Sequence, residues 1–242
     1  MHPRVPSPLR DRRSSDSARR HKIHRDFPSV RDEIFADHTG RSIEHLDAAR
    51  AALGPGARAI ALDVTDEAGT HAFFGSLDAL DHLFITAGAL VEDAHLEPAT
   101  EVLRPAIDTR FWGALYAAKY AAPKIRGGGS ITFMSGTAAL RPIQGGAVAT
   151  ASCGAVEALA RALAVDLSPI RVNTIRPGFV DTPLLDKFLG ARKQEVLAAT
   201  AKRLPVQRVG RAEDVADAVL FLMKNGYVTG ISLTIDGGGL LV

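Results

Sequence analysis

The residues best placed for chemistry follow two short apolar runs. Ser135-Gly136-Thr137 comes directly after the run at 131–134, and Pro177-Gly178 follows the run at 170–175. Between them, residues 149–167 carry apolar side chains at helical spacing. This order predicts a strand, a helix and a parallel strand. Ligands of open parallel sheets bind beyond the carboxyl ends of the strands, so we expect ligand contacts from these two loops.

Few side chains in this sequence are candidates for a direct role in a reaction. Cys153, the only cysteine, is either a nucleophile or a small buried apolar group. Arg110 could polarise a carbonyl, hold an anionic substrate, or be a surface cation. Ser135 could orient a substrate or have its hydroxyl satisfied within the fold. The histidines lack metal-ligand spacing, so the sequence predicts no metal site.

Composition favours one α/β domain. The chain has 242 residues, 46% of them hydrophobic, and a formal net charge of +2, which argues against a general nucleic-acid binder. One cysteine excludes an internal disulfide and is compatible with the cytoplasm. No uninterrupted apolar run approaches the roughly 18 residues that span a bilayer, so we expect no membrane partner.

The remaining pattern alternates short β-rich runs with helical ones. We expect helices at 43–53, 67–77, 98–125, 184–204 and 212–223, and strands at 58–64, 82–86 and 231–235. Residues 30–35 suit a helix or a strand equally. With no internal repeat and no linker, residues 29–242 are expected to form one domain.

The segment 1–28 differs from the rest. It is crowded with Arg, Ser, His and Pro and has no hydrophobic period, so we expect it to be disordered. A basic arm of this kind could touch nucleic acid or another anionic surface, resemble a targeting peptide, or be a solvated tail without a role.

Several short motifs occur in a recognisable order. They are Leu62-Asp63-Val64, Thr86-Ala87-Gly88, the strand end with Ser135, Arg171-Val172-Asn173 leading to Pro177-Gly178, and Asp236-Gly237-Gly238. With them, the chain from about Gly40 to Val242 resembles the short-chain dehydrogenase/reductase family. The resemblance implies a Rossmann-like, doubly wound parallel sheet. It also implies an oxidoreductase that moves hydride between NAD(P)(H) and a small carbonyl or alcohol substrate, and a homodimer or homotetramer formed by the long helices around Trp112 and Ala155.

The resemblance also implies which residues hold the dinucleotide. They are Arg41, Ser42, Asp63, Val64, Ala87, Gly88, Pro177, Gly178, Val180 and Thr182. Asp63 and Val64 would lie against the adenine, and Pro177 with Gly178 would frame the nicotinamide. Many NAD-preferring relatives have an acidic residue where this chain has Arg41 and Ser42. Because a guanidinium matches phosphate geometry, NADP is favoured over NAD.

The start of the chain departs from the family pattern. A strand and a glycine-rich turn should precede Gly40, in the first part of a unit of roughly 30 residues, yet no glycine occurs before Gly40. The segment before Gly40 has the expected length but contains neither an apolar strand nor a glycine-rich turn. Either its coding sequence is read out of frame, or the N-terminus is divergent. The other two reading frames of the gene distinguish these hypotheses.

The family's catalytic residues are also replaced. The tyrosine position is Ala149, the lysine position Cys153, the serine position Gly136 and the asparagine position Arg110. Alanine has no proton to give, whereas the family's phenol, with an unperturbed pKa of about 10, needs the lysine's help. Four hypotheses stay open: an oxidoreductase with altered proton-transfer groups, a non-catalytic dinucleotide-binding or regulatory protein, an inactive frameshifted product, and nucleic-acid binding through the basic segment 1–28. The catalytic residues are therefore unknown at this point.

Overall fold

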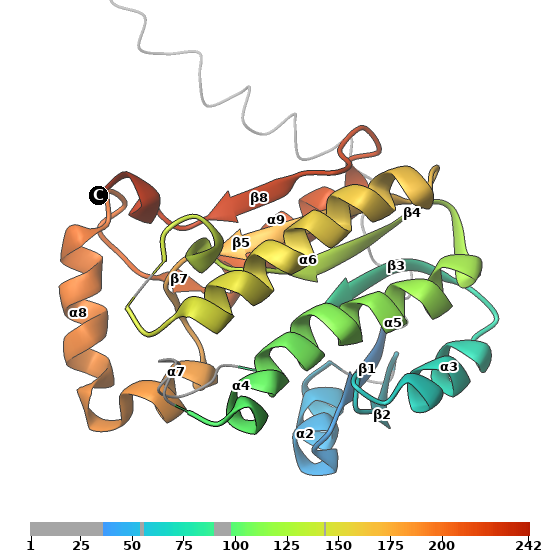
Figure 1. Cartoon of the computed structure of the whole chain (residues 1–242), viewed down its shortest axis with the longest axis horizontal. Coiled ribbons are helices and arrows are strands. Elements are labelled where there is room, and N and C mark those ends of the chain that lie inside the picture. Colours follow the sequence, from blue (N-terminus) through green and yellow to red (C-terminus); the bar gives the residue numbers. More distant parts are fainter. Residues whose placement is uncertain (1–35, 54–55, 90–97, 143) are drawn as a thin grey trace, which may run out of the picture. The chain divides into compact units, whose positions relative to one another are not determined.

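A computed structural model of the chain describes residues 36–53, 56–89, 98–142 and 144–242 (Figure 1). The basic segment 1–28 lies outside the described residues, as do residues 30–35, which suited a helix or a strand equally. The chain forms two compact units, Met1–Ile60 and Ala61–Val242. The second unit contains a four-stranded sheet and most of the residues expected at the site.

The first unit holds a helix and a strand pair. Its elements are β1 (Ala36–Gly40), α2 (Ile43–Leu53) and β2 (Ala57–Ala61), which ends at the unit boundary. Strands β1 and β2 are hydrogen-bonded to each other. Helix α2 has the predicted bounds, and its acidic first turn (Glu44) and basic last turn (Arg50) complement the helix dipole.

Strand β2 is shorter than expected, ending at Ala61 rather than at residue 64. The cause lies just beyond it. An Asp63 carboxylate oxygen accepts the Thr65 backbone N–H at 3.0 Å and the Thr65 hydroxyl at 2.8 Å. Such a local side-chain turn competes with strand pairing.

The second unit is built on a parallel sheet with the strand order β3-β4-β5-β8. The strands are β3 (Leu80–Ile85), β4 (Ile125–Met134), β5 (Arg171–Pro177) and β8 (Ser232–Ile235). In the register, Ile131 lies opposite Val172, and Ile175 opposite Leu233. Helix α6 (Ala147–Asp166) connects β4 to β5. The predicted strand, helix and parallel strand are therefore confirmed, as is the α/β class.

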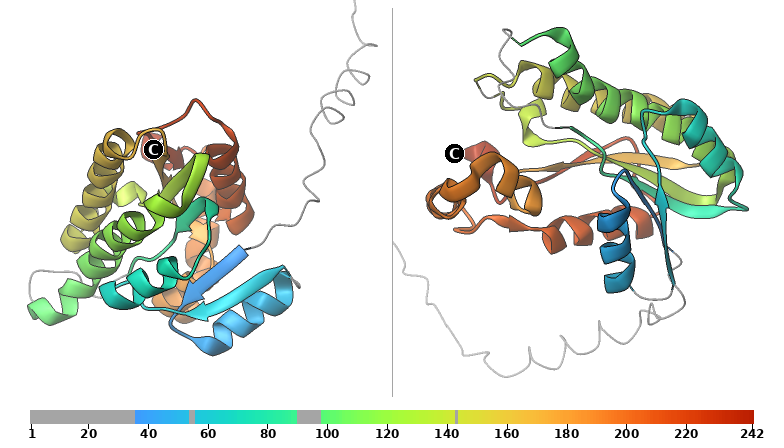
Figure 2. Two further views of the ribbon diagram at one scale, coloured as in Figure 1. Left: turned by 90° about the vertical axis from the view of Figure 1, so that its right-hand side faces the viewer. Right: turned by 90° about the horizontal axis from the view of Figure 1, so that it is seen from below.

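Helices cover both faces of this sheet. Helices α5 (Gly113–Ala121) and α6 lie on one face, and α9 (Ala212–Lys224) lies on the other (Figure 2). Because side chains alternate along a strand, Ile131 and Phe133 pack into the core under α5 and α6, whereas Met134 packs under α9. Full burial of a side chain such as Phe133 contributes about 1.5–3 kcal/mol.

Helix α6 is apolar because it packs on the sheet. Val156 and Ala160 on its inner face are each 1% exposed and belong to the core. Among the described helices, α6 is the one whose length and composition would suit a bilayer span, with a mean hydropathy of 1.4. A helix that lies against a sheet core meets the same criterion.

The helix expected at 98–125 is divided. Helix α4 (Thr100–Ile107) runs into a π-helical turn, Asp108–Trp112, and then into α5. Pro105 lies inside α4 and has no N–H to donate. Within the π-helical turn, the Thr109 hydroxyl donates to the Pro105 carbonyl at 2.7 Å. Such π-helical turns are frequent at functional sites.

The helix expected at 184–204 is also divided. It consists of α7 (Pro183–Leu189), a short 3-10 turn and α8 (Lys193–Arg203). Gly190 ends α7 with a φ of +50°, a conformation that favours glycine. Smaller differences concern the 67–77 helix, which is α3 (Glu67–Gly75), and a short pair of strands, β6 (Val180–Asp181) and β7 (Gly210–Arg211).

Candidate active site

The carboxyl ends of β3, β4 and β5 form one edge of the sheet. Ile85 pairs with Phe133 and Met134 with Ile175, so the loops after these strands lie side by side. The Ser135 N–H also donates to the Ile175 carbonyl at 2.8 Å. The structure thus brings together the loops that begin at Thr86, Ser135 and Gly178, which is where ligands of open parallel sheets bind.

Arg110 reaches this edge from the π-helical turn. It is buried, with 9% of its surface exposed, and its Nη1 lies 3.1 Å from the Cys153 sulfur. Its Nε is buried and has no hydrogen-bond partner in the described residues. A Cβ on Gly88 would lie 2.4 Å from Nη2 of Arg110, so the guanidinium packs directly on the Gly88 backbone.

Three of the four substituted catalytic positions are neighbours. Cys153 contacts Arg110, and a Cβ on Gly136 would lie 3.5 Å from its sulfur. Ala149 is half-buried one turn before Cys153 on α6. A thiol and a guanidinium therefore occupy the place where the family pattern has polar proton-transfer groups.

The tyrosines of α5 serve other contacts. The Tyr120 hydroxyl donates to a Glu67 carboxylate oxygen at 2.8 Å, and Tyr116 stacks on Trp112 with ring centroids 6.0 Å apart. Both Tyr116 and Trp112 line a hollow of about 600 Å³ on the outer side of α5 and α6. In the part of the chain that the structure describes, neither tyrosine contacts Cys153.

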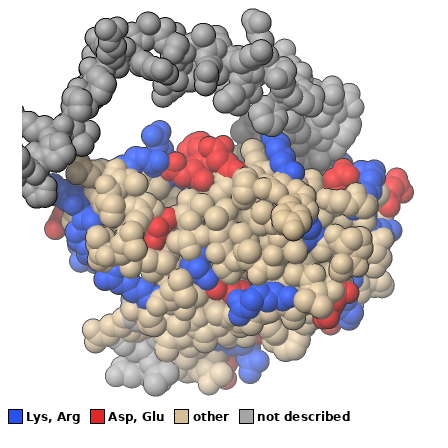
Figure 3. Space-filling model, turned by 90° about the horizontal axis from the view of Figure 1, so that it is seen from above, with Lys and Arg blue, Asp and Glu red and all other residues tan. Residues whose placement is uncertain are grey.

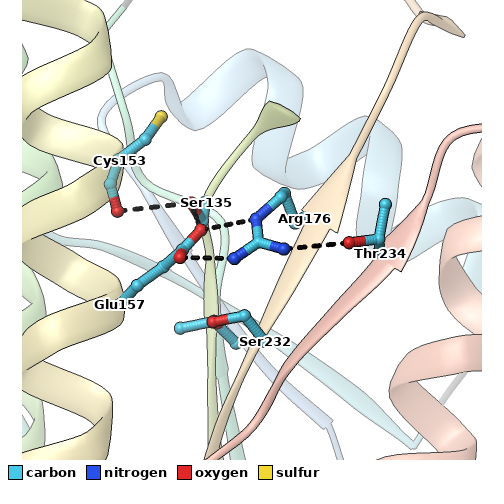
Figure 4. Close-up of polar contacts among 7 residues, drawn as sticks. Ser135, Cys153, Glu157, Arg176, Ser232 and Thr234 are labelled. Atoms are coloured by element: carbon cyan, nitrogen blue, oxygen red, sulfur yellow. Dashed lines mark hydrogen bonds and ion pairs between the residues drawn. The ribbon is translucent and has the colours of Figure 1, made fainter. Parts of the chain in front are cut away.

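Directly behind Cys153 lies a buried polar network (Figure 4). The Ser135 hydroxyl donates to Glu157 Oε1 at 2.7 Å and lies 3.3 Å from the Cys153 carbonyl oxygen. Arg176 donates to both Glu157 oxygens, at 2.8 and 2.5 Å, and to the Thr234 hydroxyl at 3.0 Å. The Cys153 sulfur points away from this network.

The opposite charges of the buried Glu157 and Arg176 compensate each other. Burial alone would raise the pKa of Glu157, but the hydrogen bonds from Arg176 and Ser135 outweigh burial and hold that pKa below its ordinary 4.5. The bond to Glu157 raises the pKa of Arg176. The hydroxyl of Ser135 is therefore committed to Glu157, which favours a structural role over substrate orientation. Sequence reasoning missed Glu157 and Arg176.

The residues expected at the dinucleotide are spread over both units. Arg41 and Ser42 follow β1 in the first unit and are exposed. In the second unit, Val64 packs on Gly113, where a Cβ would lie 2.7 Å from a Val64 methyl. Ala87 packs against the α5–α6 core.

The remaining expected residues lie after β5. Gly178 packs on Asp236 so closely that a Cβ would come within 2.6 Å of the aspartate side chain. Val180 lies in β6 and packs under α9, and Thr182 directly precedes α7. Packing against the Asp236 backbone therefore requires glycine at 178, whatever ligand binds there, whereas a larger residue at 88 would displace the end of the Arg110 side chain. Among the described residues, no three His, Cys, Asp or Glu side chains gather as metal ligands would.

Comparisons with known proteins agree with this fold. A family model described as Enoyl-(Acyl carrier protein) reductase matches residues 33–239. The short-chain dehydrogenase/reductase malC of Malbranchea aurantiaca is 37% identical over 166 residues, which are 67% of this chain and 62% of malC. The uncharacterized oxidoreductase YxbG of Bacillus subtilis (strain 168) is 34% identical over 233 residues, covering 85% of this chain and 84% of YxbG. The chain thus spans less than two thirds of malC's length.

Solved structures give the same result. The structure of MalC reductase/Diels-Alderase from Malbranchea aurantiaca superposes with a TM-score of 0.79 at 30% identity, covering 85% of this chain and 86% of that one. A small-chain dehydrogenase in complex with NADPH gives a TM-score of 0.70 at 32% identity, covering 87% and 100%. The Rossmann-like, doubly wound architecture is confirmed.

Proposed function

This chain belongs to the short-chain dehydrogenase/reductase family, and from that membership we propose that it is an NAD(P)-dependent oxidoreductase. It transfers hydride between the nicotinamide and a small carbonyl or alcohol substrate. The observation that supports this most is the shared edge of β3, β4 and β5, where the loops at Gly88, Ser135 and Gly178 meet.

The described residues at this edge fit the nicotinamide half of such a cofactor. Gly136 and Ala149 are small and half-buried, so no large side chain at these two positions covers the strand ends. The buried Nε of Arg110 is a donor without a partner among the described residues. We assign the nicotinamide end to Pro177, Gly178, Val180 and Thr182, the nearby ribose to Ala87 and Gly88, and the adenine end to Asp63 and Val64.

Substitution of the tyrosine alters the proton step. A bound nicotinamide dinucleotide supplies or accepts the hydride. Ala149 has no proton to give, and the Ser135 hydroxyl is held by Glu157. In this proposal the proton comes from solvent water that reaches the edge of the sheet, so turnover is slower than in relatives that have a tyrosine and a lysine.

We favour NADP over NAD because Arg41 follows β1 and is exposed. A guanidinium forms charge-assisted hydrogen bonds with a 2′-phosphate that NAD lacks. Arg41→Glu should weaken NADPH binding about tenfold or more and leave NADH binding unchanged or improved. Lys224→Glu, an exposed charge reversal at the end of α9, is the matched control.

The test is a fluorescence titration of the full chain with NADPH and NADH, followed by addition of ketones, aldehydes and oxo acids. Saturable NADPH binding and NADPH oxidation support the proposal. Binding of NADPH without its oxidation by any of these carbonyl compounds indicates a non-catalytic dinucleotide-binding protein. Failure to bind either dinucleotide contradicts the proposal and favours an inactive product.

We also propose a cytoplasmic location, on the single cysteine and the absence of a disulfide among the described residues.

A further inference from the structure

Arg110 differs from the other buried arginines that the structure describes, which are Arg171 and Arg176. Arg176 forms a two-pronged ion pair with Glu157. Arg171 donates to backbone carbonyls, among them those of Leu222 at 2.5 Å and Met223 at 2.7 Å. Within the described residues, Arg110 has neither an acid nor a carbonyl, and its one hydrogen bond goes to the Cys153 sulfur.

A thiol is a poor partner for a permanent charge. Sulfur is a weak acceptor, whereas a buried guanidinium needs an anion or several good acceptors to offset its loss of water. Among the described residues, the Nε of Arg110 is buried without a hydrogen-bond partner. The Nε of Arg171 lacks one too, but the other nitrogens of Arg171 donate to carbonyl oxygens, whereas Arg110 donates only to the Cys153 sulfur. An anionic ligand would supply the missing charge and the missing acceptors together.

The position of Arg110 indicates which ligand this is. The guanidinium lies on Gly88, at the end of β3, and against Cys153, whose sulfur is next to Gly136. These residues surround the edge of the sheet where the proposed function puts the reacting carbonyl or alcohol. A planar carboxylate accepts hydrogen bonds from a guanidinium in matching geometry.

We propose that Arg110 binds a carboxylate of the substrate, so that the substrates are oxo acids or hydroxy acids rather than neutral ketones and alcohols. The identity of the reacting group depends on the proposed function. The anion site does not, because it follows from the burial of Arg110 and its lack of an acid among the described residues. A neutral carbonyl would accept a hydrogen bond but bring no charge to offset that of Arg110, which no acid among the described residues offsets.

The experiment compares benzoate with benzamide, which has nearly the same shape and no charge. Each is titrated calorimetrically into the full chain without dinucleotide, and again with saturating NADPH. The proteins are the wild type, Arg110→Met and Arg104→Met, an exposed arginine of α4 that serves as the matched control. We expect benzoate to bind the wild type and the control equally, Arg110→Met about tenfold or more weakly, and benzamide weakly throughout.

Three outcomes overturn the proposal. One is equal binding of benzoate and benzamide to the wild type, which would mean that Arg110 polarises a neutral carbonyl. Another is unchanged benzoate binding in Arg110→Met. The third is loss of benzoate binding when NADPH is present, which would mean that a dinucleotide phosphate fills the site. The wild-type comparison holds even if Arg110→Met folds poorly, which circular dichroism would reveal. Failure of NADPH binding with benzoate binding intact would contradict the proposed function alone.

Discussion

At the scale of single residues, the site contains one arginine that is paired with an acid and one that has no acid partner among the described residues. Arg176 is held by Glu157, and Arg110 faces a thiol. The replacement of the family's tyrosine by Ala149 and of its lysine by Cys153 could be predicted from the sequence, because the two positions have a fixed spacing on one helix. The partners of Glu157 could not be predicted, because Ser135 and Arg176 come from the ends of two different strands, far from Glu157 in the sequence.

We predict that Glu157→Gln lowers the free energy of unfolding by about 3 kcal/mol, because it leaves the Arg176 charge buried and unpaired. Denaturant unfolding measures this. The control is Asp81→Asn, which removes the charge of Asp81 from its ion pair with Arg126. In that pair the side chains are 63% exposed for Asp81 and 60% for Arg126. That change should cost at most about 1 kcal/mol. Equal losses in the two variants would show that the buried pair has no special role.

The same pair predicts a pH dependence. The pKa of Glu157 is lower in the folded chain than its ordinary 4.5, so folding favours the ionised form. The resulting stability is present above about pH 4.5 and is lost as pH falls through the lowered pKa. The difference in unfolding free energy between wild type and Glu157→Gln should therefore shrink on acidification. A difference that stays constant down to pH 3 would contradict this.

At the scale of elements, the π-helical turn between α4 and α5 sets the position of Arg110. In this turn, the Thr109 hydroxyl donates a hydrogen bond to the Pro105 carbonyl and accepts one from the Ala89 N–H at 2.8 Å. One side chain thus joins this turn to the loop after β3.

Thr109→Val should cost about 1 kcal/mol in unfolding free energy, because it leaves the Ala89 N–H without this partner. The matched control is Thr132→Val in β4, whose buried hydroxyl has no hydrogen-bond partner in the described residues. That change should be neutral or stabilising, since it removes an unsatisfied polar group. Thermal and chemical unfolding of both variants gives the comparison, and a larger loss for Thr132→Val would refute the assignment.

Element type was predictable where periodicity and turn residues agreed, and boundaries were less so. Residues 43–53 fold as the predicted helix, and the strands before Ser135 and Gly178 lie where the apolar runs predicted them. The divisions of the long helices depend on Pro105 and on the positive φ of Gly190. The sequence shows both residues. An isolated glycine is tolerated within a helix, and a proline can kink a helix without ending it, so the divisions were not predicted.

At the scale of the whole molecule, the parallel sheet was predictable because strands and helices alternate along the chain. On the face drawn in Figure 3, basic and acidic residues are interspersed, which suits a small-molecule enzyme better than a nucleic-acid binder. The burial of Arg110 was not predictable, since it depends on how the π-helical turn meets Gly88 and α6.

We expect a homodimer or homotetramer that uses the outer side of α5 and α6. Trp112 is 43% exposed and Val165 is 76% exposed, and Trp112 lines the hollow on this side. Trp112→Glu should shift the chain toward the monomer in size-exclusion chromatography with light scattering. Val206→Glu, 53% exposed and beyond α8, is the control. A wild-type monomer, or an oligomer that Trp112→Glu leaves intact, would contradict this expectation.

Hydrogen–deuterium exchange of the full chain, with and without NADPH, tests the dinucleotide site most directly. Exchange should slow in the peptides that contain residues 86–89, 135–137 and 177–182, where β3, β4 and β5 end. Helix α9, which packs on the opposite face of the sheet, should change little. Unchanged exchange in all three loops at saturating NADPH, or slowing confined to other segments, would contradict the account.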